Sequence, residues 1–245
     1  MRYLILSDIH SNWEGLEAVL KAADGLYDRI VCLGDLVGYG ADPNPVVDWV
    51  RANVPVVIRG NHDKACSGLE SLEWFNEIAR EAALWTLNQL TPDNLQYLIA
   101  LAKGPVDSDG MTLVHGSILD EDEYVVSPRD AANVFPYLDG HLTLFGHTHI
   151  QGGFILFQDR LQIVRPMPDQ GPQYLELQEE EKYLINPGSV GQPRDGDWRC
   201  GFALYDPAEH LIVFYRIEYD IATAQQKIRD AGLPEHLANR LSAGR

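Results

Sequence analysis

The first sixty residues alternate short apolar runs with segments of helical periodicity. The apolar runs, each of strand length, lie at residues 2–6, 29–33 and 55–58. Residues 12–24 place apolar side chains at helical spacing, and residues 43–53 begin with a proline, which suits the first turn of a helix. This β-α-β order predicts a parallel sheet covered by helices, with ligand-binding groups at the carboxyl ends of its strands.

The middle of the chain is predicted to be helical over residues 69–102. A break at Thr91-Pro92 has the pattern of an N-cap followed by proline at the first helical position, so two helices are expected. Apolar runs at residues 111–114 and 142–145 predict two more strands. An acidic loop and a helix that begins at Ser127-Pro128 separate these strands.

The last third of the chain changes character. Residues 152–219 consist mainly of strand patterns separated by turns, and residues 220–229 and 234–241 close the chain as helices. An α/β half is therefore followed by a mainly β half. Because no linker, repeat or low-complexity tract interrupts the sequence, residues 1–245 are predicted to form a single domain, with its C-terminal helices from about residue 220.

Composition and charge narrow the choice of function. The 36 acidic and 19 basic side chains give a net charge of −17, which opposes binding to long nucleic acids or to anionic membrane surfaces. The N-terminal apolar run is too short for a signal peptide. Three widely spaced cysteines predict neither a disulfide framework nor a thiolate zinc site. A cytoplasmic location is expected.

Histidine and aspartate side chains gather directly after the predicted strands. The segments are Ser7-Asp8-Ile9-His10, Gly34-Asp35, Gly60-Asn61-His62-Asp63, Val114-His115-Gly116 and Gly146-His147-Thr148-His149. Residues two apart on an extended chain point the same way, so Asp8 with His10, and His147 with His149, each aim two side chains at one point. Imidazole with carboxylate suits first-row divalent metals.

Each segment also has an ordinary structural interpretation. Gly34-Asp35 alone is typical of a turn, His115 of a hydrogen-bonded core histidine, and Asp8-x-His10 of a turn with an N-cap. Only His147-x-His149 favours a metal by itself. Five such segments, each at a strand end, are hard to obtain without a shared ligand.

In this order the five segments resemble the calcineurin-like metallophosphoesterases. Residues 34–40 and 186–194 are similar to the small bacterial and archaeal members of phosphodiesterase type. The resemblance extends from residue 2 to about residue 219. It implies an α/β fold in which two mixed β-sheets form a sandwich flanked by helices, in agreement with the pattern of elements above.

Carried over residue by residue, the resemblance implies two divalent metal ions. Asp8, His10 and His149 would hold one ion, Asn61, His115 and His147 would hold the other, and Asp35 would bridge them. Manganese is favoured, while iron, cobalt, nickel and zinc stay open because mixed nitrogen and oxygen ligands accept all of them. Such a pair of ions polarises the attacking and leaving oxygens of a phosphoester and supplies a bridging hydroxide.

The resemblance also assigns two catalytic residues. His62 would face the leaving-group oxygen, where an imidazolium donates a proton or stabilises developing charge. Its neighbour Asp63 would orient the ring, although a plain turn carboxylate is an equally good interpretation.

One departure from the phosphoprotein phosphatases bears on the substrate. In those enzymes an arginine follows the Gly-Asp segment, whereas here residues 37–40 contain none. A monoanionic diester needs fewer cationic contacts than a dianionic monoester, so diesters are favoured. Arg194 partly replaces the missing cation or is a solvent-exposed arginine. Tyr39 and Asn12 lie near the expected cleft and either contact substrate or support the fold.

The sequence therefore predicts a metal-dependent phosphoric ester hydrolase, a phosphodiesterase in preference to a phosphatase, that acts on a small phosphoester or nucleotide. The alternatives are a phosphomonoesterase or protein phosphatase, and a non-catalytic binding scaffold of the same fold. A retromer subunit is such a scaffold and has lost the catalytic histidine, which this chain keeps as His62. The physiological substrate and the oligomeric state stay open.

Overall fold

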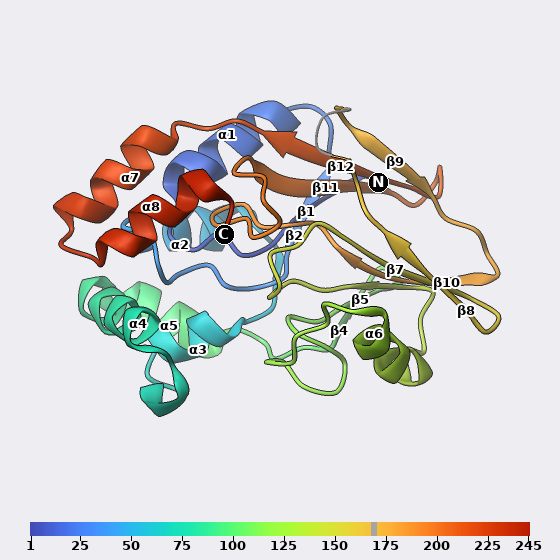
Figure 1. Ribbon diagram of the computed structural model, residues 1–245, viewed down its shortest axis with the longest axis horizontal. Coiled ribbons are helices and arrows are strands. Elements are labelled where there is room, and N and C mark those ends of the chain that lie inside the picture. The colour runs from blue at the N-terminus through green and yellow to red at the C-terminus, as the bar shows by residue number, and fades with distance from the viewer. Residues whose placement is uncertain (168–170) are drawn as a thin grey trace.

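Two mixed β-sheets packed face to face form the centre of the computed structural model, which describes residues 1–167 and 171–245, without the side chain of Trp74 (Figure 1). Six strands of the described residues make the first sheet, in the order β3 (Val56–Val57), β2 (Arg29–Cys32), β1 (Tyr3–Leu6), β11 (Cys200–Asp206), β12 (Leu211–Ile217) and β9 (Gln173–Glu176). Six make the second, in the order β4 (Val106–Ser108), β5 (Met111–Leu113), β6 (Leu142–Leu144), β10 (Glu181–Asn186), β7 (Gly152–Phe157) and β8 (Arg160–Val164). The predicted α/β sandwich is confirmed.

Each sheet contains one parallel block. In the first sheet β1, β2 and β3 run parallel, with Leu6 opposite Cys32 and Cys32 opposite Val57. In the second sheet β5, β6 and β10 run parallel, and the remaining pairings in both sheets are antiparallel. The parallel order predicted for the first sixty residues is therefore confirmed. Each parallel block presents the carboxyl ends of its strands at one edge of its sheet.

Burial on both faces explains why the parallel strands are continuously apolar. In β1, Tyr3 and Ile5 pack between the two sheets, while Leu4 and Leu6 pack against helices on the outer face. Alternate side chains of a strand point to opposite faces, so a strand covered on both sides carries no polar stripe. The apolar run at residues 2–6 follows from this position.

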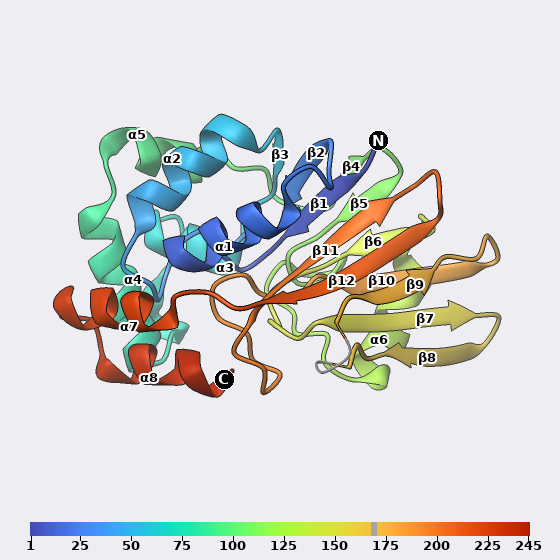
Figure 2. The ribbon, with the colours of Figure 1, turned by 90° about the horizontal axis from the view of Figure 1, so that it is seen from above.

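Most helices gather at the left of the view in Figure 2, beside the carboxyl end of β1. The hydrophobic core on the outer face of the first sheet is shared by α1 (Trp13–Ala23), α2 (Pro43–Asn53), α4 (Glu77–Gln89), α5 (Pro92–Ala100), α7 (Ile221–Asp230) and α8 (Glu235–Ala243), of which α1 packs directly on β11 and β12. The second sheet is covered by α6 (Pro128–Val134), whose N-cap Ser127 accepts a hydrogen bond from the Asp130 amide. In the described part of the chain, no helix combines the length and apolar character needed to cross a membrane.

The structure corrects one element prediction and adds two short elements. The segment 69–102 is not helical from residue 69, because a 3-10 turn at Leu72–Trp74 precedes α4, which begins at Glu77 after the N-cap Asn76. The short helix α3 (Asn61–Cys66) and strand β4 were not predicted. Both are too short for hydrophobic periodicity to reveal them. The expected break at Thr91 is confirmed, since its hydroxyl caps α5.

Candidate metal centre

The parallel strands of both sheets are each followed by a candidate site residue. Asp8 and His10 follow β1, Asp35 follows β2, and Asn61 follows β3. In the second sheet His115 follows β5, His147 and His149 follow β6, and the loop that carries Arg194 follows β10. The carboxyl ends of the two parallel blocks thus bring together segments far apart in the sequence, as the sequence predicted.

Backbone strain concentrates in these loops. Positive φ angles between 49° and 63° occur at the non-glycine residues Asp8, His10, Ser11, Asp35, Tyr39, His147 and His149. A side chain in this region costs about 1–3 kcal/mol and persists only where the surroundings enforce it. Favourable contacts elsewhere in the fold therefore offset the cost of this backbone conformation in the loops that carry the candidate ligands.

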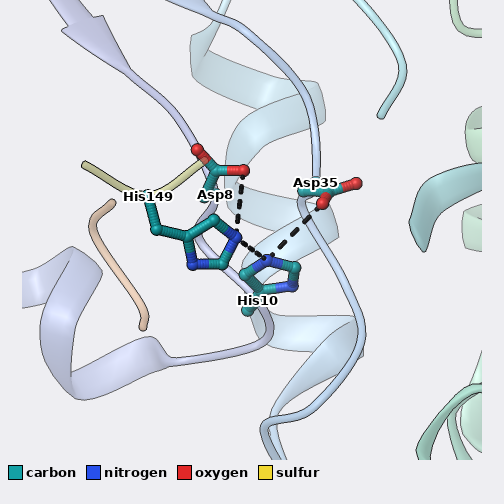
Figure 3. A group of neighbouring side chains, drawn as sticks. All are labelled: Asp8, His10, Asp35 and His149. Atoms are coloured by element: carbon teal, nitrogen blue, oxygen red, sulfur yellow. Dashed lines mark hydrogen bonds and ion pairs between the residues drawn. The ribbon is translucent and has the colours of Figure 1, made fainter. Parts of the chain in front are cut away.

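Two groups of metal-ligating side chains lie side by side and share Asp35. The first contains Asp8, His10, Asp35 and His149, and Figure 3 shows the two imidazole rings facing each other. The Nε2 atoms of His10 and His149 are 3.1 Å apart. His149 Nε2 lies 3.4 Å from Asp8 Oδ1, and His10 Nε2 lies 3.5 Å from Asp35 Oδ2.

The second group contains Asp35, His115 and His147. His115 Nε2 lies 3.4 Å from Asp35 Oδ2 and 3.3 Å from Asn61 Oδ1, so the Asn61 amide faces the same point. All seven side chains predicted as metal ligands are thus brought together, and Asp35 is the member common to both groups.

Backbone carbonyl groups orient the histidine rings. Because a carbonyl only accepts, the ring nitrogen facing it must carry the proton. The acceptors are Val37 O for His10 Nδ1, Gln192 O for His149 Nδ1, Leu33 O for His115 Nδ1 and Asp122 O for His147 Nε2, at 2.9, 2.5, 2.7 and 3.1 Å. On His10, His149 and His147 the opposite nitrogen then keeps its lone pair, which is the state that binds a metal.

Divalent cations fit this arrangement on the chemistry of its donors. Asp8 Oδ2 and Asp35 Oδ2 are buried and have no hydrogen-bond partner among the described residues. His10 and His149 direct two lone pairs at each other, and burial lowers the pKa of both rings well below the usual value. A cation between these atoms would satisfy the carboxylate oxygens and both lone pairs.

In the second group, the attraction between opposite charges outweighs burial and shifts the pKa values of Asp35 and His115. Burial opposes ionisation of Asp35, but the adjacent His115 holds the pKa of that carboxyl well below its usual range. Burial likewise favours a neutral His115 ring, yet the Asp35 carboxylate raises the pKa of His115 to about 10. Burial raises the pKa of Asp8 to about 7. Without a metal, a proton on His115 neutralises part of the buried negative charge.

His62 lies beside the two groups and lines a groove together with Tyr39, Asn61, Phe75 and Tyr124. Its Nδ1 atom is buried and has no hydrogen-bond partner among the described residues. Burial lowers the pKa of His62 to about 4. Burial thus favours the neutral ring over the imidazolium that the resemblance implies.

Asp63 does not orient the His62 ring as predicted. Its Oδ2 accepts hydrogen bonds from the backbone N–H of Asp35 and Gly60, at 2.8 and 2.9 Å. Its Oδ1 accepts from the backbone N–H of Leu36 and Val37, at 2.9 and 3.3 Å. The carboxylate therefore joins the loop after β2, from which three of these amides come, to Gly60 at the start of α3.

The three predicted substrate contacts have different surroundings. Asn12 caps α1 by accepting from the Gly15 amide at 3.0 Å and donates to Gly191 O at 2.9 Å, so its amide supports the fold, the second of the two roles considered for it. The Tyr39 ring lies 4.8 Å from the His10 ring and 4.3 Å from the His62 ring, between centroids. The guanidinium carbon of Arg194 lies 5.6 Å from the Tyr39 centroid.

Sequence reasoning missed several residues of this region. Arg240 of α8 places its guanidinium carbon 5.8 Å from the Tyr39 centroid, although no motif surrounds it. Phe75 contacts His62 edge to face at 5.4 Å, and Tyr124 lies 3.9 Å from His147, both between ring centroids. Gly38 has a φ of 90°, and a Cβ there would meet His62 Nδ1 at 2.8 Å. Only Gly38, within a glycine-rich loop, carried a local signal.

Solved structures share this architecture over the full chain. The metallophosphoesterase from Sphaerobacter thermophilus matches with a TM-score of 0.87 and 42% identity, covering 100% of this chain and 99% of that chain. A hypothetical protein from Pyrococcus horikoshii matches in fold, with a TM-score of 0.80 and 19% identity over 100% of this chain and 98% of that chain.

Sequence comparison agrees with the structural match. An uncharacterized protein of Methanocaldococcus jannaschii is 38% identical over 253 residues, which cover 98% of this chain and 97% of that protein. The family model described as the calcineurin-like phosphoesterase superfamily domain matches residues 1–210. With the sandwich fold and the clustered histidine and aspartate side chains, this match shows that the chain belongs to the calcineurin-like phosphoesterase superfamily.

Proposed function

We propose that this protein is a phosphodiesterase that uses two divalent metal ions, with manganese favoured, to hydrolyse a small phosphodiester or nucleotide. The observation that carries the proposal is the pair of ligand groups that share Asp35. Asp8, His10 and His149 would hold one ion and Asn61, His115 and His147 the other. When bound, two such ions polarise the phosphoryl oxygens and activate water.

The residues around the ligands supply the remaining functions. His62 lies at the groove, with one ring nitrogen that no other described side chain engages. Its neutral N–H would donate a hydrogen bond to the leaving oxygen, where negative charge develops. Tyr39 packs with a tilted ring against both His10 and His62 and limits how far either ring can turn.

Two features support a diester as the substrate. The loop after Asp35 carries Gly38 and Tyr39 where an arginine would clamp a dianionic phosphate. The groove walls contributed by Tyr39, Phe75 and Tyr124 are aromatic and suit an organic group on the ester. A monoester has only one such group.

Metal reconstitution tests this proposal. Protein treated with chelator and reloaded separately with manganese, iron, cobalt, nickel or zinc is assayed on bis-p-nitrophenyl phosphate and on p-nitrophenyl phosphate. We expect metal-dependent turnover with the diester preferred. A preference for the monoester would instead establish a phosphatase, and inactivity with every metal would contradict an enzymatic role.

His62 is tested in the same assay. His62→Ala should lower kcat by roughly 10²–10⁴-fold, the usual contribution of a group that assists the leaving oxygen, while metal content stays unchanged. His236→Ala removes an exposed histidine of α8 and serves as the control. An unchanged kcat in His62→Ala would remove His62 from the mechanism.

A further inference from the structure

Two arginines from distant parts of the chain meet over one aromatic ring. Arg194 lies in the loop after β10, and Arg240 lies in the last turn of α8. Their guanidinium carbons are 5.6 and 5.8 Å from the centroid of Tyr39. Since Tyr39 itself contacts His10 and His62, its ring lies between the two cations and the candidate catalytic centre.

Neither arginine forms an ion pair with an acidic side chain of the described residues. Arg194 donates to Gln192 Oε1 at 2.9 Å, and its Nε is buried without a hydrogen-bond partner in the described part of the chain. Arg240 donates from Nε to the backbone carbonyl of Arg245. Within residues 1–167 and 171–245, both partly buried guanidinium groups thus lack a carboxylate side-chain partner, although the chain carries 36 acidic residues.

The positive charge of Arg194 affects the pKa of Arg240. Burial lowers the pKa of Arg240, and the nearby charge of Arg194 lowers it further. Two like charges held together cost free energy unless an anion lies near both. An anion that accepted hydrogen bonds from both groups would remove this cost, and a phosphate matches the forked donors of arginine.

The fold holds both arginines in place. One face of α8 is buried through its side chains Leu237, Ala238 and Leu241. Beyond this helix, the carbonyl oxygen of Gly244 accepts a hydrogen bond of 3.0 Å from the Gly196 amide, two residues after Arg194. The backbone after α8 and the loop of Arg194 are therefore joined by a hydrogen bond close to both arginines.

The adjoining groove indicates the chemical class of the rest of the ligand. Tyr39 belongs to both the arginine pair and the groove, whose other walls include Phe75 and Tyr124. The Tyr124 side chain is about half exposed and lies beside His147. Aromatic walls next to a cationic site suit a nucleoside that carries phosphate.

We propose that Arg194 and Arg240 form an anion subsite that binds a second phosphate of a nucleotide substrate, separate from the phosphate that is hydrolysed. This inference rests on the proposed function, because it names the class of diester that the centre prefers. The substrate is a nucleotide diester that bears an additional phosphate. Arg240, at the far end of the sequence, is then a residue that determines specificity.

A pair of chromogenic nucleotides isolates the second phosphate. Thymidine 5′-(p-nitrophenyl phosphate) and its 3′-phosphorylated derivative contain the same scissile diester and differ by one phosphate group. For the manganese-loaded protein we expect kcat/KM to be at least about tenfold higher on the 3′-phosphorylated compound, as hydrogen bonds between charged groups give. A ratio near one in the wild-type protein would overturn the proposal.

Variants assign the preference to the arginines. Arg240→Gln and Arg194→Gln should each lower the ratio of the two kcat/KM values about tenfold, and Arg240→Lys should restore part of it. The control Arg160→Gln removes an exposed positive charge from β8 and should leave the ratio unchanged. An unchanged ratio in Arg240→Gln, or an equal fall in Arg160→Gln, would contradict the subsite.

A binding measurement separates this inference from the proposed function. Thymidine 3′,5′-bisphosphate is titrated calorimetrically into chelator-treated protein, which removes any contribution from metal or turnover. We expect Arg240→Gln and Arg194→Gln each to raise Kd about tenfold. If neither ester is hydrolysed with any metal but Kd rises in both variants, the catalytic proposal fails and the subsite stands. Absence of binding to the wild type, or the same Kd in all three proteins, overturns the subsite.

Discussion

The carboxylate of Asp63 holds the backbone of Asp35: its Oδ2 accepts a hydrogen bond of 2.8 Å from the Asp35 amide. In return, Asp35 Oδ1 accepts a hydrogen bond of 2.8 Å from the His62 amide. The loop after β2 and the start of α3 are thus joined at the residue that both ligand groups share. Asp63 therefore acts on the centre through the position of Asp35.

Replacing Asp63 by asparagine tests this relationship. The amide nitrogen of Asp63→Asn cannot accept, so two of the four backbone N–H groups lose their partner. An unsatisfied buried donor costs about 1–3 kcal/mol, so we expect a lower free energy of unfolding together with weaker metal binding. Denaturant unfolding and metal titration measure both. Asp107→Asn, at an exposed position of β4, should change neither quantity, and full metal affinity in Asp63→Asn would contradict the positioning role.

A methyl group at Gly38 should displace His62. In Gly38→Ala the new Cβ would lie 2.8 Å from His62 Nδ1, closer than side chains approach. We expect kcat to fall by at least about tenfold while metal content is retained, because a small misplacement of a catalytic group is costly.

A matched control separates this contact from backbone strain. Gly25 also has a positive φ, of 72°, but a Cβ there would meet nothing within 4 Å. Gly25→Ala should therefore lose only about 1–2 kcal/mol of stability, the cost of a left-handed side-chain position, and keep its kcat. Equal losses of activity in both variants would show that strain, and not contact with His62, is responsible.

Metal affinity should depend on pH through His115 and Asp8. Metal binding requires deprotonated ligands, and the metal-free protein carries a proton on His115 up to about pH 10. Affinity should therefore rise about tenfold per pH unit between pH 7 and 9. Below pH 7 the slope should steepen, because Asp8, whose pKa is about 7, also becomes protonated.

Calorimetry can count these protons. Manganese titrations at one pH in buffers of different ionisation enthalpy give the number of protons released on binding. At pH 8 we expect about one proton, from His115, because burial lowers the pKa of His10 and His149 so far that their rings are already neutral. An affinity that does not change between pH 7 and 9 would contradict a protonated His115.

Lys64 should help to position the second ligand group through its contact with Asp122, although it is not itself a ligand. Its Nζ lies 2.7 Å from Asp122 and 3.2 Å from Glu121, and the Asp122 carbonyl accepts the hydrogen bond from His147. Lys64→Met leaves these carboxylates with fewer cations, so we expect a loss of about 1–3 kcal/mol of stability and weaker metal binding. Lys103→Met removes an exposed cation 3.7 Å from the same Glu121 and should change stability by less than about 1 kcal/mol. Equal effects of the two substitutions would contradict the special role of Lys64.

The sequence predicted the fold class and the candidate ligands where the chemistry-bearing residues directly follow an apolar strand. The parallel strands are apolar because both of their faces are buried, so each strand end is visible as the first polar segment after an apolar run. Asp8, Asp35 and His147 occupy such positions. For this reason the fold class and the convergence of the candidate ligands could be predicted without the structure. The extent of the helix before Thr91 could not, because residues 69–76 have helical composition but are interrupted by a 3-10 turn.

Other features depend on contacts that no local pattern encodes. Asp63 follows His62 in the chain, yet the four amides that converge on it come mostly from the loop after β2. Arg240 lies 201 residues from Tyr39, and only the packing of α8 brings the two together. The sequence by itself thus determined which side chains surround the candidate metal centre, because each stands in a polar segment directly after an apolar strand and the order of these segments resembles the family. Only the tertiary structure decided which residues support and flank that centre, because hydrogen bonds and packing between distant segments follow from the assembled sandwich.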